Sequence, residues 1–440
     1  MKFFLLSIII LTIKNILSKN NHLIKFSFKL NIKSPENLTN YFFNNSYISS
    51  IYIGTPKQKI DIQFLFDTFS LILPGHSFNG QYNEKISNSY ENLTNISTEF
   101  DYPIKYPFGL KSTEKFYIND NEINLNFLLI DNIVNNSKLD FKCGGIGLGI
   151  KTFFNQNDPN FIQQLIEKNF IESFCFTLKF INENEGFIYI GKLPHEYEKD
   201  KNKFKFEFYK TVSGNGESFF KLWGIYFKYV YYENYLNKEE ENEGIFTNEV
   251  IFNPKLKGVE GTYEFKEFID KKFFNKLFEN GQCEIKKFFN ELKQIYYLCY
   301  ICDLSINLNL YKPLYFYDNI LNYTFNLDKN DLFKKYKNKY IYQIFFRDEY
   351  NGLWTLGDIF FQKYQITFDQ DKKIIGFYIN ENKQFNYLYI VIIILIITLI
   401  FLFYYLLKIY LQYKTKPKNV INEYYDYKPN SLNKIFIEIS

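Results

Sequence analysis

The sequence has 440 residues, a length that allows two domains of ordinary size. Its 52 basic and 48 acidic residues give a net charge of +4 without a polybasic block, which excludes an electrostatic nucleic-acid-binding surface. Hydrophobic residues make up 46% of the chain and charged residues 23%, which excludes general disorder. Because 51 Phe and 39 Tyr reflect a compositional bias, aromatic stripes are interpreted first as core.

The first residues have the pattern of a signal peptide. Lys2 precedes an uncharged run, 3–13, which is too short to span a bilayer and has the length of a signal-peptide core, and Ser18 is a small residue suited to cleavage. We expect residues 1–18 to be a signal peptide. A buried strand is the alternative interpretation of this run.

The main body is predicted to be mostly β. From about residue 23 to residue 380, short aromatic and β-branched runs such as 49–53 alternate with Asn, Asp, Gly and Pro. Helical periodicity is clearest at 160–168 and 264–278. A β-rich chain of this length suggests two barrels. The predicted N-terminal and C-terminal lobes are 23–190 and 191–380.

Five cysteines lie in this body, and an oxidising secretory compartment favours disulfides over thiols or zinc. They are Cys143, Cys175, Cys283, Cys299 and Cys302. None of the three histidines lies near the closely spaced last pair, so a bridge from Cys283 to Cys299 or to Cys302 is favoured over a metal or redox site. Cys143 and Cys175 can form a second bridge. We expect no metal and no cofactor.

A second uncharged run, 384–407, predicts a transmembrane helix, because at about 1.5 Å per residue it exceeds the roughly 30 Å hydrocarbon core. The residues that follow carry lysines without an intervening acid up to Lys418, so the positive-inside rule makes residues 408–440 a cytosolic tail. We expect a type I protein of a secretory or endolysosomal membrane or the cell surface, with its ectodomain lumenal or extracellular.

Six N-glycosylation sequons lie within the predicted lumenal region. Their acceptors are Asn37, Asn44, Asn92, Asn95, Asn135 and Asn322. They agree with the predicted topology, although in a chain this rich in Asn several sequons arise by chance.

The most informative segment is an Ile-Gly-Thr-Pro turn at 53–56 and the alternating apolar strand 57–66, which runs into Asp67 and Thr68. A carboxylate delivered from an apolar strand is costly unless it is hydrogen-bonded or used. A structural acid at a strand end is the alternative interpretation of Asp67.

At these residues the sequence resembles the pepsin family of aspartic peptidases. The segment 67–70, Asp-Thr-Phe-Ser, is similar to the family's Asp-Thr-Gly-Ser motif, with Thr68 and Ser70 as supporting residues. The resemblance covers roughly residues 45–380. Its further segments are 143–149, 174–178, 186–192, 353–361 and 375–377. It implies a bilobal double β-barrel and a cleft that accepts an extended polypeptide as an added strand.

The family's chemistry needs a second carboxylate from the other lobe, so that two carboxyl groups share one proton. The segment expected to supply it is 249–256, where Asn253 stands in the position of the Asp. An Asn amide does not exchange a proton, and general acid–base catalysis is typically worth about 10²- to 10⁴-fold. Asn253 therefore predicts a catalytically impaired homologue, a pseudoprotease.

The loops around both motifs also depart from the family pattern. In the family, a Thr or Ser after each Asp cross-braces the two loops, and a Gly then permits a tight turn. Here Pro254 has neither hydroxyl nor N–H, while Phe69 and Lys255 replace the two glycines. These changes predict that both loops have been rebuilt. The strand before Asp67 also exceeds the usual family spacing by two residues, which preserves strand parity.

The resemblance further places Tyr106 in the position of the family's flap tyrosine, with Pro107 and Phe108 as departures. An ordinary surface or core tyrosine is the alternative. The first functional hypothesis is an impaired, monomeric homologue that binds polypeptide and serves a binding, structural or sorting role. An active acid endopeptidase that uses Asp67, and a surface scaffold or adhesion protein, remain as alternatives.

Overall fold

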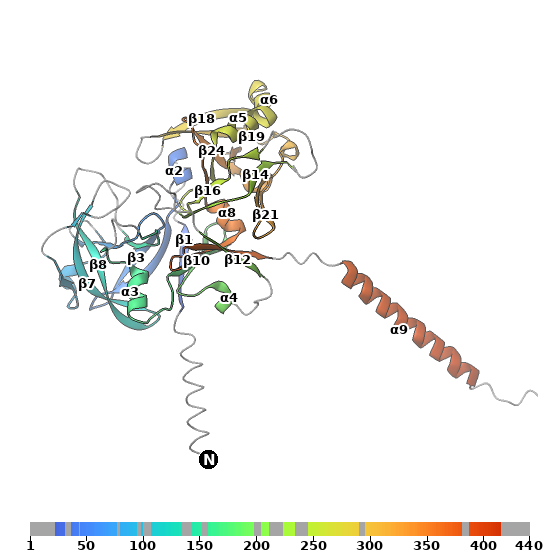
Figure 1. Cartoon of the computed structure of the whole chain (residues 1–440), viewed down its shortest axis with the longest axis horizontal. Coiled ribbons are helices and arrows are strands. Elements are labelled where there is room, and N and C mark those ends of the chain that lie inside the picture. The colour runs from blue at the N-terminus through green and yellow to red at the C-terminus, as the bar shows by residue number, and fades with distance from the viewer. Residues whose placement is uncertain are drawn as a thin grey trace, which may run out of the picture. The chain divides into compact units, whose positions relative to one another are not determined.

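The computed structural model describes thirteen stretches of the chain (Figure 1). These are 23–30, 37–43, 45–76, 80–94, 98–99, 107–133, 143–151, 157–197, 204–210, 223–233, 245–289, 295–380 and 387–414. The signal-peptide prediction, Tyr106 and three sequon acceptors, Asn44, Asn95 and Asn135, fall outside them. The chain divides into two units, Met1–Asn380 and Glu381–Ser440. The first is mostly β and contains a closed six-stranded barrel and a half-barrel.

The closed barrel is formed by strands from the N-terminal part of the chain. In order around the barrel they are β2 (Tyr47–Ile53), β3 (Gln58–Leu65), β9 (Gly144–Gly147), β4 (Leu71–Pro74), β8 (Asn121–Ile133) and β7 (Pro107–Ile118), and β7 closes the ring by pairing with β2. The alternation predicted for β3 is confirmed for Ile60, Ile62 and Phe64, which are buried with partly exposed residues between them, while the last residue of the strand, Leu65, is also buried. The short strands β5 (Glu91–Asn92) and β6 (Thr98–Glu99) pair with β7.

The sheet that contains this barrel continues across the chain's midpoint. Its further strands, in order, are β1 (Ile24–Leu30), β11 (Glu185–Ile190), β10 (Cys175–Asn182), β26 (Gln365–Asp369), β27 (Ile374–Asn380) and β12 (Phe204–Lys210). The pairing of β10 with β26 joins residues from the two predicted lobes. A shared sheet therefore links the two halves of the sequence.

The C-terminal part forms a nine-stranded sheet. Its strands, in order, are β13 (Trp223–Tyr226), β16 (Glu249–Phe252), β25 (Trp354–Leu356), β17 (Val259–Gly261), β24 (Ile344–Arg347), β19 (Tyr296–Asp303), β23 (Lys339–Tyr342) and β22 (Phe333–Tyr336), and β18 (Cys283–Phe289) pairs with β19. A four-stranded sheet has the order β15 (Ile245–Phe246), β14 (Tyr229–Tyr232), β20 (Leu314–Asp318) and β21 (Tyr323–Leu327).

The helices of this unit are short. They are α2 (Leu38–Phe43), α3 (Phe161–Glu167), α4 (Pro194–Tyr197), α5 (Tyr263–Ile269), α6 (Asn275–Glu279), α7 (Lys329–Leu332) and α8 (Asp358–Lys363), with a π-helical segment, Asp270–Phe274, between α5 and α6. Both predicted helical stretches are confirmed. Asn160 caps α3 by accepting from the Gln163 amide, and Thr262 caps α5 by accepting from the Phe265 amide.

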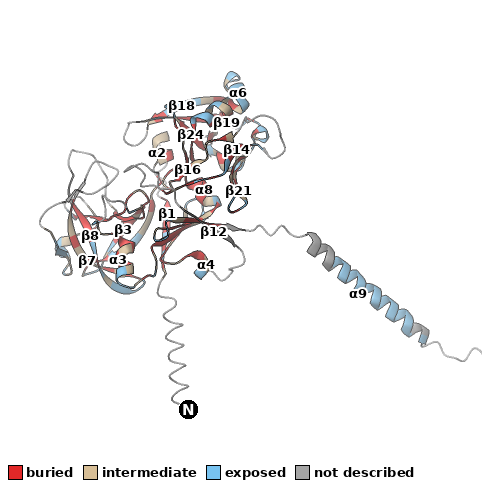
Figure 2. Ribbon diagram, viewed as in Figure 1, coloured by how far each residue is buried: buried red, intermediate tan, exposed pale blue. Residues whose placement is uncertain are grey.

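Aromatic residues fill the core, as the composition predicts. The twelve largest fully buried side chains in the described residues are all aromatic, Trp354 and Tyr47 among them. Figure 2 shows buried residues along the strands of the body. In the second unit, α9 (Tyr387–Lys414) contains a window, Ile394–Leu411, that is long and apolar enough to cross a membrane. The helix continues past residue 407, the predicted end, because nothing in 408–414 breaks it. Lys408 therefore lies within the helix.

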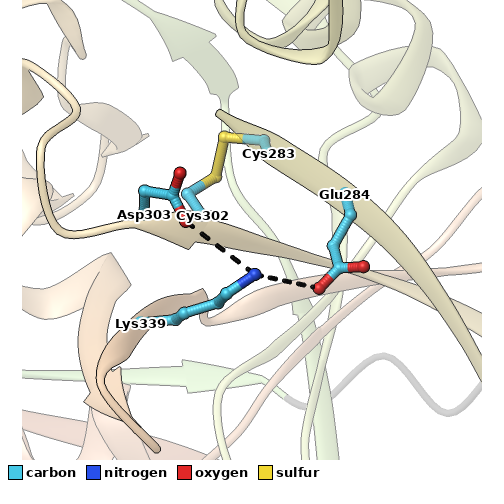
Figure 3. The surroundings of a disulfide bond; sticks show 5 residues. All are labelled: Cys283, Glu284, Cys302, Asp303 and Lys339. Carbon is cyan, nitrogen blue, oxygen red and sulfur yellow. Dashed lines mark hydrogen bonds and ion pairs between the residues drawn. A yellow bond between two sulfur atoms is a disulfide. The ribbon is translucent and has the colours of Figure 1, made fainter. Parts of the chain in front are cut away.

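One disulfide forms in the described part of the chain, between Cys283 and Cys302 (Figure 3). The two residues are direct partners in the β18–β19 ladder, with Cα atoms 4.0 Å apart, whereas Cys299 lies opposite Lys286. The register thus decides between the two predicted partners of Cys283. Beside the bridge, Lys339 pairs with Glu284 at 3.2 Å.

The second predicted bridge does not form, because Cys175 carries a thiol. Cys175 and Cys299 are both buried, and burial raises the pKa of each thiol to about 12. A thiol with such a pKa stays protonated at physiological pH, so neither residue is a reactive nucleophile.

Candidate functional site

Asp67 lies just beyond the end of β3, where the chain leaves the barrel wall. Its carboxylate accepts two hydrogen bonds from the Lys255 ammonium, at 2.9 Å to Oδ1 and 3.1 Å to Oδ2. The side chains are 27% and 21% exposed, so the ion pair is partly shielded and still reached by water. The side chain brought to Asp67 from the C-terminal part is therefore a cation.

Lys255 is presented by the turn that follows β16. The backbone N–H of Asn253 donates to the backbone carbonyl of Leu356 at 3.0 Å, which continues the pairing of β16 with β25 by one residue. Asn253 Oδ1 then accepts from the Lys255 amide at 3.2 Å, so this side chain stabilises its own turn. The Tyr47 hydroxyl donates to the Pro254 carbonyl at 2.8 Å and holds the turn against the barrel.

The strands on both sides of the ion pair follow one pairing order. In the N-terminal part, β3 pairs parallel with β9, β9 antiparallel with β4, and β4 parallel with β8. In the C-terminal part, β16 pairs parallel with β25, β25 antiparallel with β17, and β17 parallel with β24. The four-strand motif is therefore repeated within the chain.

The strand registers align the two copies of the motif residue by residue. Phe64 and Leu71 are both partners of Ile146, just as Phe252 and Val259 are both partners of Leu356. The two partners are separated by the same number of residues in each copy. A third contact agrees, since Gly147 donates to the Ser70 carbonyl at 3.1 Å and Gly357 to the Gly258 carbonyl at 2.9 Å.

This equivalence pairs Asp67 with Lys255 and Leu65 with Asn253. The motif alignment of the sequence analysis instead set Asp67 against Asn253, a difference of two residues. The β3–β9 ladder ends at Leu65, so Phe66 and Asp67 extend beyond the paired strand. When the two copies are superposed by their strand pairing, Asn253 corresponds to a leucine and Asp67 corresponds to a lysine. Neither pair of equivalent positions contains two carboxylates.

Phe69 and Lys255, which stand in the positions of the two family glycines in the motif alignment, have ordinary backbone conformations. Phe69 is 1% exposed and stacks on Phe174, and neither Phe69 nor Lys255 has a positive φ. Thr68 Oγ1 is buried without a hydrogen-bond partner among the described residues. Pro254 offers no N–H that could donate to it.

Ser70 has a local structural contact. Its hydroxyl donates to Asp158 Oδ2 at 2.7 Å. Burial raises the pKa of Asp158, and the hydrogen bond from Ser70 opposes that shift. Ser70 therefore ties the loop to the segment before α3 and does not contact the Asp67 carboxylate.

Three of the predicted glycosylation acceptors lie in the described residues. The described sequon acceptors, Asn37, Asn92 and Asn322, are exposed. Within the described ranges, no cluster of three or more His, Cys, Asp or Glu side chains is arranged to hold a metal. Sequence reasoning treated Lys255 only as a lost glycine. The positive charge of Lys255, in a turn expected to face Asp67, was the signal in the sequence that could have predicted the ion pair.

Comparison with known proteins adds no identification: no family model matches the chain, and no curated protein matches it significantly.

Proposed function

We propose that this chain is a membrane-anchored, pepsin-like protein whose ectodomain binds an extended polypeptide without hydrolysing it. The sequence motifs and the repeated four-strand motif support the pepsin-like assignment. The closed barrel, the half-barrel and the shared sheet are compatible with it. The apolar helix α9 supports the anchor. The lysines that follow the uncharged run support a cytosolic tail and therefore a lumenal or extracellular ectodomain.

The observation that carries the loss of hydrolysis is the ion pair between Asp67 and Lys255. An acid peptidase of this type needs one ionised carboxylate to activate water and one protonated carboxyl group to donate to the scissile carbonyl. An ammonium has three donors and no acceptor, so Lys255 occupies carboxylate oxygens that a catalytic water would use. The nearby Asn253 amide cannot replace the missing proton carrier.

Polypeptide binding is the function that remains when such a cleft loses its chemistry. Recognition by strand addition uses main-chain hydrogen bonds and does not require the catalytic carboxylates. The loops after β3 and β16 still meet, because Lys255 contacts Asp67, and Tyr47 on β2 contacts Pro254 in the same turn. The conversion therefore removes catalysis while it keeps the two repeats joined.

The full-length protein in detergent is tested with a reduced and alkylated protein substrate between about pH 3 and 6, the range in which a proton-sharing carboxyl pair works. We expect no cleavage, and we expect fluorescent peptides from the same substrate to bind and be recovered intact. The Asp67→Asn variant is the control for contaminating proteases, because it removes the one candidate carboxylate.

Three results separate the hypotheses. Cleavage that disappears in Asp67→Asn overturns the proposal in favour of an active endopeptidase. If the protein neither cleaves the substrate nor binds the peptides, the scaffold or adhesion alternative is favoured. Peptide binding without cleavage supports the proposal.

A further inference from the structure

A row of side chains crosses the outer face of the four-stranded sheet. Tyr229 on β14 pairs with Tyr317 on β20, which pairs with Thr324 on β21. Residues paired directly across strands share a face, so the three side chains lie side by side. The alternate residues Val230 and Phe316 are fully buried on the opposite face.

The two tyrosines form a partly open aromatic surface. Their rings are stacked with centroids 6.2 Å apart and an interplanar angle of 11°, and Tyr229 is 42% exposed. We name Tyr229 and Tyr317 the tyrosine pair. A flat aromatic face that water reaches is suited to the apolar face of a sugar ring, whose C–H groups pack on the π electrons while its hydroxyls stay hydrated.

A glycosylation acceptor lies directly beside this pair. Asn322 is exposed in the β20–β21 turn with φ 46°, and Thr324 completes its Asn-Tyr-Thr sequon. The Tyr317 hydroxyl donates to Asn322 Oδ1 at 3.3 Å. Because Oδ1 and Nδ2 belong to one amide, a sugar attached to Nδ2 begins next to the tyrosine pair.

The other described acceptors lack such a neighbour. Asn37 Oδ1 accepts from the Asn40 amide at the start of α2, and Asn92 Oδ1 accepts from the Thr94 amide. Both contacts are local backbone caps. Among the three described acceptors, Asn322 is the one whose side chain contacts an aromatic hydroxyl.

We propose that Asn322 carries an N-linked glycan and that its first N-acetylglucosamine packs on the tyrosine pair. In the transfer, Asn322 Nδ2 loses a proton to a base of the transferase and bonds to C1 of the sugar. The C1–oxygen bond of a lipid-linked pyrophosphate donor breaks, and the pyrophosphate leaves with the electron pair. The inference rests on the lumenal placement of the ectodomain proposed above.

Occupancy is measured on the full chain expressed in cells that attach N-linked glycans. Enzymatic glycan release in ¹⁸O water converts each modified Asn into labelled Asp, which peptide mass spectrometry assigns to a position. We expect label at Asn322, its loss in Thr324→Ala and its retention in Thr324→Ser. Label at Asn37 or Asn92 with none at Asn322 overturns the inference and leaves the lumenal placement standing. Label at no sequon overturns both.

Packing is measured as the rate of glycan release from folded protein at Asn322. We expect Tyr229→Ala to raise this rate about fivefold, the factor that corresponds to an aromatic contact of ordinary strength. Tyr226→Ala removes a similarly exposed tyrosine, 46% exposed on β13, and serves as the matched control with an unchanged rate. Equal rates in both variants overturn the packing of the sugar on the tyrosine pair.

Discussion

The two copies of the four-strand motif differ in how their sheets end. In the N-terminal copy, β8 has 13 residues and pairs along its length with the 12-residue β7, which reaches β2 and closes the barrel. In the C-terminal copy, the corresponding strand β24 has 4 residues and pairs with β19 in a nine-stranded sheet. The same pairing order thus occurs next to a long hairpin that closes a barrel and next to a much shorter strand.

The copies also differ at their strand ends, where the side chains are not part of a ladder. Asp67 in one copy corresponds to Lys255 in the other, and the fully buried Leu148 corresponds to the buried Asp358. Asp358 accepts from the Gly258 amide at 2.9 Å and from Asn45 at 2.8 Å. Backbone pairing preserves the motif, while the residues beyond it have changed charge.

The largest expected effect on stability concerns a glycine that both copies have at the equivalent position. A Cβ on Gly147 would lie 2.3 Å from the Phe69 backbone, and one on Gly357 would lie 2.2 Å from the Leu256 carbonyl oxygen. We expect Gly147→Ala and Gly357→Ala each to lower the free energy of unfolding by about 3 kcal/mol, because backbone atoms cannot move aside. Urea unfolding of the full-length protein in detergent measures the loss.

Gly352→Ala is the control for these two variants, since its nearest neighbour would lie at an ordinary 3.5 Å. We expect a change of less than about 1 kcal/mol there. A large loss in only one of the two motif glycines would contradict the equivalence of the copies.

A smaller effect concerns the acid present in only one copy. Burial raises the pKa of Asp358, and the Gly258 amide and Asn45 oppose the shift. The Asp358 carboxyl therefore keeps its proton to higher pH in the folded state than in the unfolded state, where it titrates at about pH 4. The stabilisation from this proton is present below that pH and is lost as pH rises through the folded-state pKa.

Asp358→Asn removes the titration and keeps an acceptor for the Gly258 amide. We expect the free energy of unfolding of the wild type, relative to this variant, to fall as the pH rises from about 4 to 7. Denaturant unfolding at several pH values measures the difference. A relative stability that increases with pH would contradict the raised pKa.

The smallest expected effect on stability concerns the ion pair that joins the two copies. Because the Asp67–Lys255 pair is partly exposed, Lys255→Met is expected to cost about 1 kcal/mol or less and to create no proteolytic activity. Lys266→Met, which breaks the ion pair with Asp270, is a matched control. A loss above about 3 kcal/mol for Lys255→Met alone would make this pair a principal connection between the repeats.

The sequence by itself determined the features that depend on neighbouring residues. Alternation predicted the buried face of β3, periodicity predicted α3 and α5, and an uncharged run predicted the apolar helix α9. Local chain physics is sufficient for these, because each pattern repeats within one strand or helix. The sequence also limited the partners of Cys283 to two residues.

Only the tertiary structure decided which distant residues meet. The choice of Cys302 over Cys299 depends on the register of β18 with β19, and the meeting of Asp67 with Lys255 depends on ladders between segments far apart in the chain. A shift of two residues keeps every side chain on the same face of its strand, so alternation cannot detect it. Strand pairing decided that, among the described residues, a lysine from the C-terminal part forms the ion pair with Asp67.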